Sequence, residues 1–329
     1  MKRMASVSIC LACLAMLLTN AAASFAANPQ PWPAKPLRFV MTAPAGSSID
    51  AIGRIVGDKL KDLLGQPIIV ENRAGAGGTL ATDFVAKSAP DGYTMVLSFN
   101  GPLAFGPHMY AKLPYNPFTD LIPVIITTSQ PNVLTVNSAL PVNSLKELVA
   151  YARANPGKLS YASVGSGSSS HLTMELMKAM AGLEIVHVPF DGSPPAITSV
   201  VANETQMLFA VPTAITPLFK TGKVKMLAVS GRVRYSLLPE VPTLAEAGLP
   251  NFEALAWNGV LVPAGTPHDI VTRLNRELNT VLRDTSVIEK LNNVGLEPVG
   301  GTPEAFRNLI RAESEKWAPI IERTGAKVD

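Results

Sequence analysis

The sequence of 329 residues predicts an α/β protein in which mostly parallel sheets carry helices on both faces, the doubly wound arrangement. Two observations predict this fold class. Short apolar runs alternate with helical patterns along the chain, and one construction occurs twice: an apolar run, a loop of small and hydroxyl residues, then a helical pattern. The length suits one large or two medium domains.

The N-terminal segment has the pattern of a cleaved secretory signal peptide, expected at residues 1–26. Lys2 and Arg3 precede an apolar stretch over residues 7–18, and a small-x-small sequence ends at Ala26. The apolar stretch is shorter than the roughly 20 residues that a spanning helix needs. The sequence therefore predicts an exported protein.

The composition excludes several chemistries. Cys10 and Cys13 both lie inside the predicted signal peptide, so the exported chain has no disulfide, thiolate metal site or cysteine nucleophile. The sequence has 28 Lys and Arg against 25 Asp and Glu, and removal of Lys2 and Arg3 brings this balance closer to neutral. A near-neutral chain gives no electrostatic case for binding nucleic acid or a membrane surface.

Apolar runs predict the strands, with many prolines at their edges, and amphipathic patterns predict the helices. Capping-box spacing marks expected helix starts at Ser144, Thr243 and Thr266, each with an acidic residue three positions later. The expected strands are residues 37–41, 68–70, 95–99, 122–126, 133–136, 159–162, 185–188, 207–209 and 226–229. The expected helices include residues 49–64, 79–87, 144–155, 169–181, 196–202, 213–221, 266–285, 286–294 and 303–324.

The domain boundaries are inferred from two changes in sequence character, since no flexible linker is evident. If the chain leaves one sheet near residue 126 and returns near residue 229, residues 27–126 and 229–329 form domain 1, and residues 127–228 form an inserted domain 2. Two such crossings act as a hinge. Ligands of α/β sheets sit outside the carboxyl ends of the strands, so both small-residue loops would face one cleft.

The two small-residue loops, residues 42–50 and 163–170, are candidate anion sites. The first amides of a helix have no partner and carry partial positive charge. Small residues let a ligand approach those amides closely. Two such loops in separate halves of the chain predict one small anion held from both sides, and the absence of Lys and Arg from both loops favours capture by neutral donors.

A series of short motifs runs in order through nearly all of the sequence after the signal. Together they resemble the Bug family, the TctC-like periplasmic receptors of tripartite tricarboxylate transporters. The resemblance implies a type II-like periplasmic-binding-protein fold, two doubly wound α/β domains with a ligand cleft and a hinge between them. The motifs are VENRAGAGG (70–78), APDGYT (89–94), LPYNP (113–117), ANPGKL (154–159), YAS (161–163), GSGS (165–168) followed by His171 and Leu172, HVP (187–189), LPEVPT (238–243), AEAG (245–248), PAGTP (263–267) and KW (316–317).

The same resemblance implies a periplasmic, monomeric receptor that is not an enzyme and uses no cofactor or metal. It would close on a small carboxylated organic solute and deliver it to the permease subunits of a tripartite tricarboxylate transporter, with no nucleic-acid partner. The residues that the resemblance assigns to the ligand are Ala45, Gly46, Ser47, Asp50, Gly75, Ala76, Gly77 and Asn100 in domain 1, and Ser163, Gly165, Gly167, Ser168, His171 and Asp191 in domain 2.

Two positions depart from the family's usual pattern. Ser47 stands where the family has the second Gly of Pro-x-Gly-Gly, and it adds a hydroxyl and bulk to the loop. Asp191 stands where a basic or polar residue is usual, and it brings a negative charge near the mouth of the expected cleft. If Asp191 points inward, it favours an amine or hydroxyl on the ligand or disfavours a second carboxylate.

Several of these residues have an equally simple structural explanation. Ser47 and Asp50 have capping-box spacing, so a helix cap explains them as well as a ligand does. The glycines at 75–78 also suit a plain turn between a strand and a helix. His171 is expected to be a packed or hydrogen-bonded residue, and Trp257 either lines the cleft or is a buried core residue.

Two other functions are alternatives to the transport receptor. A periplasmic hydrolase lacks support, because GSG at 165–167 is no nucleophile elbow, GAGGTL at 75–80 fails the dinucleotide pattern, and the four histidines have no metal-ligand spacing. A sensor that binds the same ligand and signals to a membrane kinase would have the same pocket. The sequence does not separate that sensor from a transport receptor.

Overall fold

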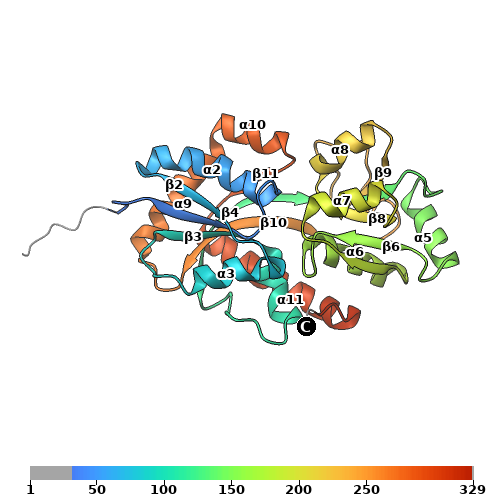
Figure 1. The fold of residues 1–329 in the computed structure, drawn as a ribbon, viewed down its shortest axis with the longest axis horizontal. Helices are drawn as coiled ribbons and strands as arrows, with labels where there is room; N and C mark the ends of the chain where they lie inside the picture. The colour runs from blue at the N-terminus through green and yellow to red at the C-terminus, as the bar shows by residue number, and fades with distance from the viewer. Residues whose placement is uncertain (1–31, 328–329) are drawn as a thin grey trace, which may run out of the picture. The chain divides into compact units, whose positions relative to one another are not determined.

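In the computed structural model, which describes residues 32–327, the strands form two sheets. The signal peptide predicted at residues 1–26 lies outside the described residues. The chain divides after Ala34, and every strand and helix named below belongs to the unit that begins at Lys35. Figure 1 shows the elements and their labels.

The six-stranded sheet combines strands from both ends of the chain, in the order β11-β4-β10-β3-β1-β2. β1 runs parallel to β2 and β3, whereas β10 lies antiparallel between β3 and β4. In Figure 1, α2 and α10 lie above this sheet and α3 and α11 below it. The strands are β1 Leu37–Met41, β2 Ile68–Asn72, β3 Thr94–Phe99, β4 Leu121–Pro131, β10 Leu255–Pro263 and β11 Glu297–Gly300.

The five-stranded sheet is built from the middle of the chain, in the order β7-β6-β8-β5-β9. β6 runs parallel to β7 and β8, and β5 runs antiparallel to β8 and β9. Helices α6 and α7 pack against β6 and β8, and α8 packs against β9. The strands are β5 Val133–Asn137, β6 Ser160–Ser163, β7 Val186–Pro189, β8 Met207–Ala210 and β9 Val224–Val229.

The helices follow the predicted order, and the last one links the two sheets. Helix α11 contacts both β4 of the first sheet and α6, a helix that packs on the second sheet. A 3₁₀ turn precedes α3 and a π-helical turn precedes α4, at Ala76–Gly78 and Gly101–Phe105. The α-helices are α2 Ser48–Leu64, α3 Thr79–Ala86, α4 Gly106–Met109, α5 Leu145–Ala154, α6 Ser169–Ala181, α7 Ser193–Val201, α8 Pro212–Lys220, α9 His268–Arg283, α10 Thr285–Asn293 and α11 Pro303–Thr324.

The prediction of mostly parallel sheets is wrong, because both sheets are mixed. The sequence prediction omitted β10 and the short β11, and β10 is the strand that lies antiparallel in the centre of the first sheet. An Asn-Gly pair, which favours a tight turn, interrupts the apolar run of β10 at Asn258 and Gly259. In the structure the pairing of β10 with β4 shifts register at these two residues, so the pair marks a bulge inside one strand.

Only one of the three predicted capping boxes starts a helix. The Ser144 hydroxyl accepts a hydrogen bond from the Glu147 amide at 3.2 Å, and α5 begins there as predicted. Thr243 and Glu246 exchange the two expected hydrogen bonds, but the residues after Thr243 form a turn. The prediction at Thr266 is wrong, because its hydroxyl donates back to the Pro263 carbonyl and α9 begins at His268.

Candidate ligand-binding site

One cavity of about 480 Å³ is lined by loops and strand ends from both sheets. Most of its lining follows the carboxyl end of a strand, which is where α/β sheets place their ligands. The first sheet contributes Thr42, Ala43, Pro44, Ser47, Ser48, Ile49, residues 74–78, Phe99, Asn100, Gln130, Asn132, Ala256, Trp257 and Asn258; the second contributes Val164, Gly165, Ser168, Ser169, Ser170, residues 190–193, Phe209, Ala210 and Val211.

The structure brings many of the predicted site residues to this cavity, but not all of them. Those that line it are Ser47, Gly75, Ala76, Gly77, Asn100, Gly165, Ser168 and Asp191. Those absent from the lining are Ala45, Gly46, Asp50, Ser163, Gly167 and His171. The hydrogen bonds described below show that most of this second group hold the lining loops in place.

Sequence reasoning missed the polar residues at the ends of β4 and β10. Gln130 and Asn132 flank Pro131 at the end of β4, and Asn258 lies in the first half of β10. Asn100 was assigned through the family resemblance, which gave no residue at the end of β4. The predicted strand there stops at residue 126, so Gln130 and Asn132 did not stand out as strand-end residues. Trp257 was expected either to line the cleft or to be a buried core residue. It does both, because it lines the cavity and is only 2% exposed.

The N-terminus of helix α2 forms one side of the cavity. Ser47 is its N-cap, and the Ser47 hydroxyl accepts a hydrogen bond from the Asp50 amide at 3.2 Å. The next two residues, Ser48 and Ile49, line the cavity, and their amides have no protein acceptor among the described residues. These amides and the positive end of the helix dipole suit an anionic oxygen.

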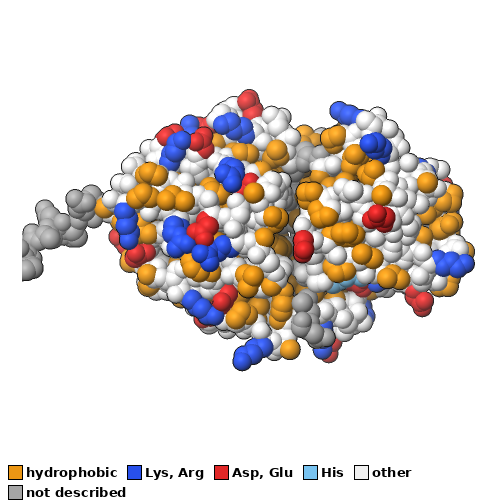
Figure 2. Space-filling model, viewed as in Figure 1, with side chains coloured by type: hydrophobic (Ala, Val, Ile, Leu, Met, Phe, Trp, Pro, Cys, Tyr) orange, Lys and Arg blue, Asp and Glu red, His pale blue; other side chains and the backbone are white. Residues whose placement is uncertain are grey.

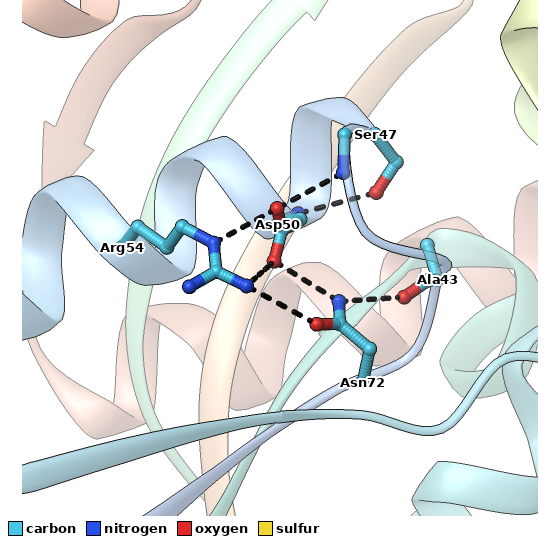
Figure 3. A network of polar contacts seen from close by, with 6 residues as sticks. Ala43, Ser47, Asp50, Arg54 and Asn72 are labelled. Atoms are coloured by element: carbon cyan, nitrogen blue, oxygen red, sulfur yellow. Dashed lines mark hydrogen bonds and ion pairs between the residues drawn. The ribbon is translucent and has the colours of Figure 1, made fainter.

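Asp50 anchors the loop that leads into α2 (Figure 3). Its carboxylate accepts hydrogen bonds from the Gly46 amide and Arg54 Nε, each at 3.0 Å, and from Asn72 Nδ2 at 3.1 Å. Asn72 Nδ2 also donates to the Ala43 carbonyl at 3.0 Å, which ties the loop to the end of β2. The Asp50 carboxylate is therefore engaged by residues of the protein itself. This agrees with the expectation that Ser47 and Asp50 serve the start of the helix.

The pKa of Asp50 reflects this network. Burial raises the pKa, but the hydrogen bonds from Arg54, the Gly46 amide and Asn72 outweigh burial and hold the pKa below its usual value. A lowered pKa of this kind stabilises the fold at neutral pH, and that stabilisation is lost as the pH falls below about 4.

The N-terminus of helix α6 forms the opposite side of the cavity. Ser168 is the N-cap, and its hydroxyl accepts a hydrogen bond from the His171 amide at 3.3 Å and donates to the Gly165 carbonyl at 2.6 Å. Ser169 and Ser170 line the cavity, and the described residues offer no acceptor to their amides. Helix α6 thus repeats the arrangement at α2, as the repeated sequence construction predicted.

A stack of aromatic rings supports the loop before α6 from behind. The His171 and His187 rings lie parallel with centroids 4.0 Å apart, and the Tyr161 ring stacks on His187 at 4.8 Å. His171 Nδ1 accepts a hydrogen bond from the Gly167 amide at 3.1 Å, so this nitrogen carries no proton. Burial lowers the pKa of His171 to about 3 and that of His187 to about 4, which keeps both rings neutral.

Ser163 and His187 resemble part of a nucleophilic dyad, since Ser163 Oγ and His187 Nε2 lie 2.7 Å apart. Ser163 is fully buried, and neither residue lines the cavity. A hydroxyl in that position does not reach a substrate there. Its second contact, with the Gly165 amide at 3.3 Å, gives it a role in holding the loop.

The loops from the two sheets approach closely at Gly77. Gly77 has φ +60°, and a Cβ atom built on it would lie 2.9 Å from the Ser166 carbonyl oxygen. The backbone of the first-sheet loop therefore touches that of the second-sheet loop only because residue 77 has no side chain. A second cavity of about 510 Å³ shares Gly77, Gly165 and Asp191 with the first one.

The cavity offers hydrogen bonds but no positive side chain. Among the described residues that line it, Asp191 is the only one with a formal charge. Elsewhere within residues 32–327, no cluster of three or more His, Cys, Asp or Glu side chains suits a metal ion. Over the same residues, no helix has the length and apolar character to cross a bilayer.

Two α/β sheets with a cavity between their strand ends define the fold of a periplasmic binding protein, as predicted. The family model for the tripartite tricarboxylate transporter family receptor matches residues 52–326, and the chain belongs to this family. This is a family of periplasmic solute receptors. Protein BugT of Bordetella pertussis is 36% identical over 319 residues, which are 97% of this chain and 98% of that protein.

Solved structures of similar proteins agree with the assignment. The Rhodopseudomonas palustris protein Rpa4515, solved with adipate, has 35% identity and a TM-score of 0.85, over 89% of this chain and 98% of that one. MatC of the same organism, solved with malate, has 31% identity and a TM-score of 0.82, over 88% and 100%. The periplasmic binding protein BugD has 30% identity and a TM-score of 0.83, over 90% and 99%.

Replacing Asp50 by Ala removes the acceptor that fixes the loop before α2. We expect the free energy of unfolding at pH 7 to fall by about 1–3 kcal/mol, because the Gly46 amide and Asn72 lose a buried partner. Urea unfolding measures this change. Asp58→Ala is the control on the same helix: its carboxylate is exposed and paired with Lys61, so its loss should cost much less stability than the loss of Asp50. Equal losses in both variants would contradict the anchoring role.

Replacing His171 by Asn keeps an acceptor near the Gly167 amide but removes a titrating ring. Below about pH 6.5 the unfolded chain protonates this histidine, whereas the buried ring stays neutral, so wild-type stability falls with pH by about 1.4 kcal/mol per unit for each such ring. Urea unfolding from pH 7 to pH 5 should therefore give a shallower decline for the variant. An unchanged decline would contradict a neutral, buried His171.

Proposed function

We propose that this chain is a periplasmic receptor that holds one carboxylate of a small organic solute between the N-termini of helices α2 and α6. The observation that carries the proposal is the pair of serine-capped helix starts with open amides on one cavity. The amides of Ser48, Ile49, Ser169 and Ser170 would donate to the carboxylate oxygens. Helix dipoles and hydroxyls would then stabilise the negative charge without Lys or Arg.

The relatives support this choice of ligand class. Adipate and malate, the molecules named with the two Rhodopseudomonas palustris proteins, are both carboxylates. The chain would be exported through the signal predicted at residues 1–26 and would pass its solute to the permease subunits of a tripartite tricarboxylate transporter. An enzyme is not part of the proposal, because the Ser163 hydroxyl is buried away from the cavity.

The binding step would be a closure of two domains. The chain passes from β4 of the first sheet to β5 of the second around Asn132, and returns after β9 to β10. With these crossings, domain 1 would comprise about residues 27–131 and 230–329, with residues 132–229 inserted; the first crossing lies about five residues after the boundary expected from the sequence at 126. The closed state needs only a higher affinity for the ligand than the open state, and a carboxylate that touches both helix starts provides it.

The first test is a thermal-shift screen of the mature protein, unfolded and refolded to remove any carried ligand, against small carboxylates. A ligand at a hundred times its Kd adds about 2.7 kcal/mol of stability, a shift of several degrees at about 2–4 °C per kcal/mol. We expect at least one carboxylate to raise the melting temperature without being consumed. No response across di-, tri-, hydroxy-, amino and aromatic acids would contradict the proposal, and consumption of the responder would indicate an enzyme.

Replacing Gly77 by Ala tests closure. The added Cβ would press on the Ser166 carbonyl, so we expect the affinity for a responding carboxylate to fall about tenfold or more in calorimetry. Gly157→Ala is a matched control, because Gly157 has φ +68° and open space around its Cβ, away from the cavity. It carries the same backbone strain and should bind normally. Equal affinity in the two variants would show that the loops need not approach for binding.

A further inference from the structure

Four buried polar side-chain atoms on the first-sheet side of the cavity have no partner. Asn100 Oδ1, Gln130 Oε1, Asn132 Nδ2 and Trp257 Nε1 make no hydrogen bond to any described residue. All four residues line the cavity, and none is more than 3% exposed. A buried polar group without a partner destabilises the fold, so such a group beside a cavity indicates that something in the cavity satisfies it.

The sheet register gathers these residues at one edge. Ala256 pairs with Gln130 and Trp257 with Ser129 in the ladder of β10 with β4. Asn258 pairs with Phe99, the residue before Asn100, in the ladder of β10 with β3. The four residues therefore stand on three adjacent strand ends. We call Asn100, Gln130, Asn132 and Trp257 the polar edge.

Two members of the polar edge can act only as a donor or only as an acceptor. Asn100 Nδ2 donates to the Leu255 carbonyl at 3.1 Å, so its amide cannot be turned, and Oδ1 can only accept. The indole nitrogen of Trp257 can only donate. The amides of Gln130 and Asn132 can each present oxygen or nitrogen, since no contact to a described residue fixes either orientation. The polar edge thus needs at least one donor and one acceptor from its ligand.

We infer that the polar edge is a subsite for an uncharged group that both donates and accepts hydrogen bonds, a primary amide or a hydroxyl. The inference rests on the proposed function, in which the helix starts hold a carboxylate elsewhere on the same molecule. The solute class is then a monocarboxylate with a neutral polar end.

Charged ends fit the polar edge less well. A second carboxylate accepts from Trp257 Nε1 but faces the Asn100 oxygen, which has no proton to give, and no Lys, Arg or His side chain among the described residues lines the cavity. An ammonium satisfies Asn100 but leaves the Trp257 N–H without an acceptor. Asp191 lines both cavities, and its negative charge further disfavours a ligand that carries two carboxylates.

The test is a matched panel of linear carboxylates titrated into refolded protein by calorimetry. At each of several chain lengths, the far end is a primary amide, a hydroxyl, a carboxylate, an ammonium or a methyl group. We expect the amide or hydroxyl member to bind about tenfold or more tightly than the others of its length. A diacid or ammonium member that binds more tightly would overturn the inference and leave the proposed function standing. If no member of any length binds, the proposed function itself fails.

Two variants check that the polar edge causes the preference. Trp257→Phe keeps a ring but removes the donor, and Gln130→Met removes an amide at similar volume. Each should lower the affinity for the amide or hydroxyl ligand about tenfold and leave that for the methyl-ended ligand unchanged. Trp317→Phe is the matched control, since Trp317 is buried, donates to Glu313 and does not line the cavity. An equal loss for the methyl-ended ligand, or a loss in the control, would overturn the inference.

Discussion

The unpaired amides at the start of an α-helix are the constraint on which this structure depends. Every helix begins with N–H groups that its own backbone cannot satisfy, and these are paired with capping side chains, water or ligands. Here two helices, α2 and α6, start at the same cavity, with one serine cap each and small residues in front. The charge of the proposed ligand would be balanced by these dipoles, so the cavity needs no cation of its own.

The charged and titratable groups near the site serve to fix its loops. The Asp50 carboxylate accepts hydrogen bonds from Arg54, Asn72 and the Gly46 amide (Figure 3). On the other side of the cavity, neutral His171 accepts from the Gly167 amide. These contacts tie each loop to the scaffold, and a loop fixed in this way pays a lower conformational cost on binding. In Figure 2, charged side chains gather over the left part of the surface, and fewer lie along the seam between its two halves.

The features predicted correctly are those that local sequence patterns determine, and the features missed are those that depend on tertiary contacts. The loop and helix at 163–181 was predicted closely, because apolar periodicity and a serine cap are local signals. β10 was missed because its Asn258-Gly259 pair indicates a turn, and only pairing with β3 and β4 makes it a strand. In the site, the sequence correctly singled out Asp50 and His171. Only the structure shows that both side chains hold the loops and do not line the cavity. Gln130 and Asn132 were missed because β4 runs further than its apolar core suggests.

The most direct test of this account is a crystal structure of the protein with a carboxylate that responds in the thermal-shift screen. The account predicts one carboxylate group with its oxygens within hydrogen-bonding distance of amides from both helix starts, Ser48 or Ile49 on α2 and Ser169 or Ser170 on α6. A carboxylate that touches only one helix start, or that pairs with a Lys or Arg side chain elsewhere, would contradict it.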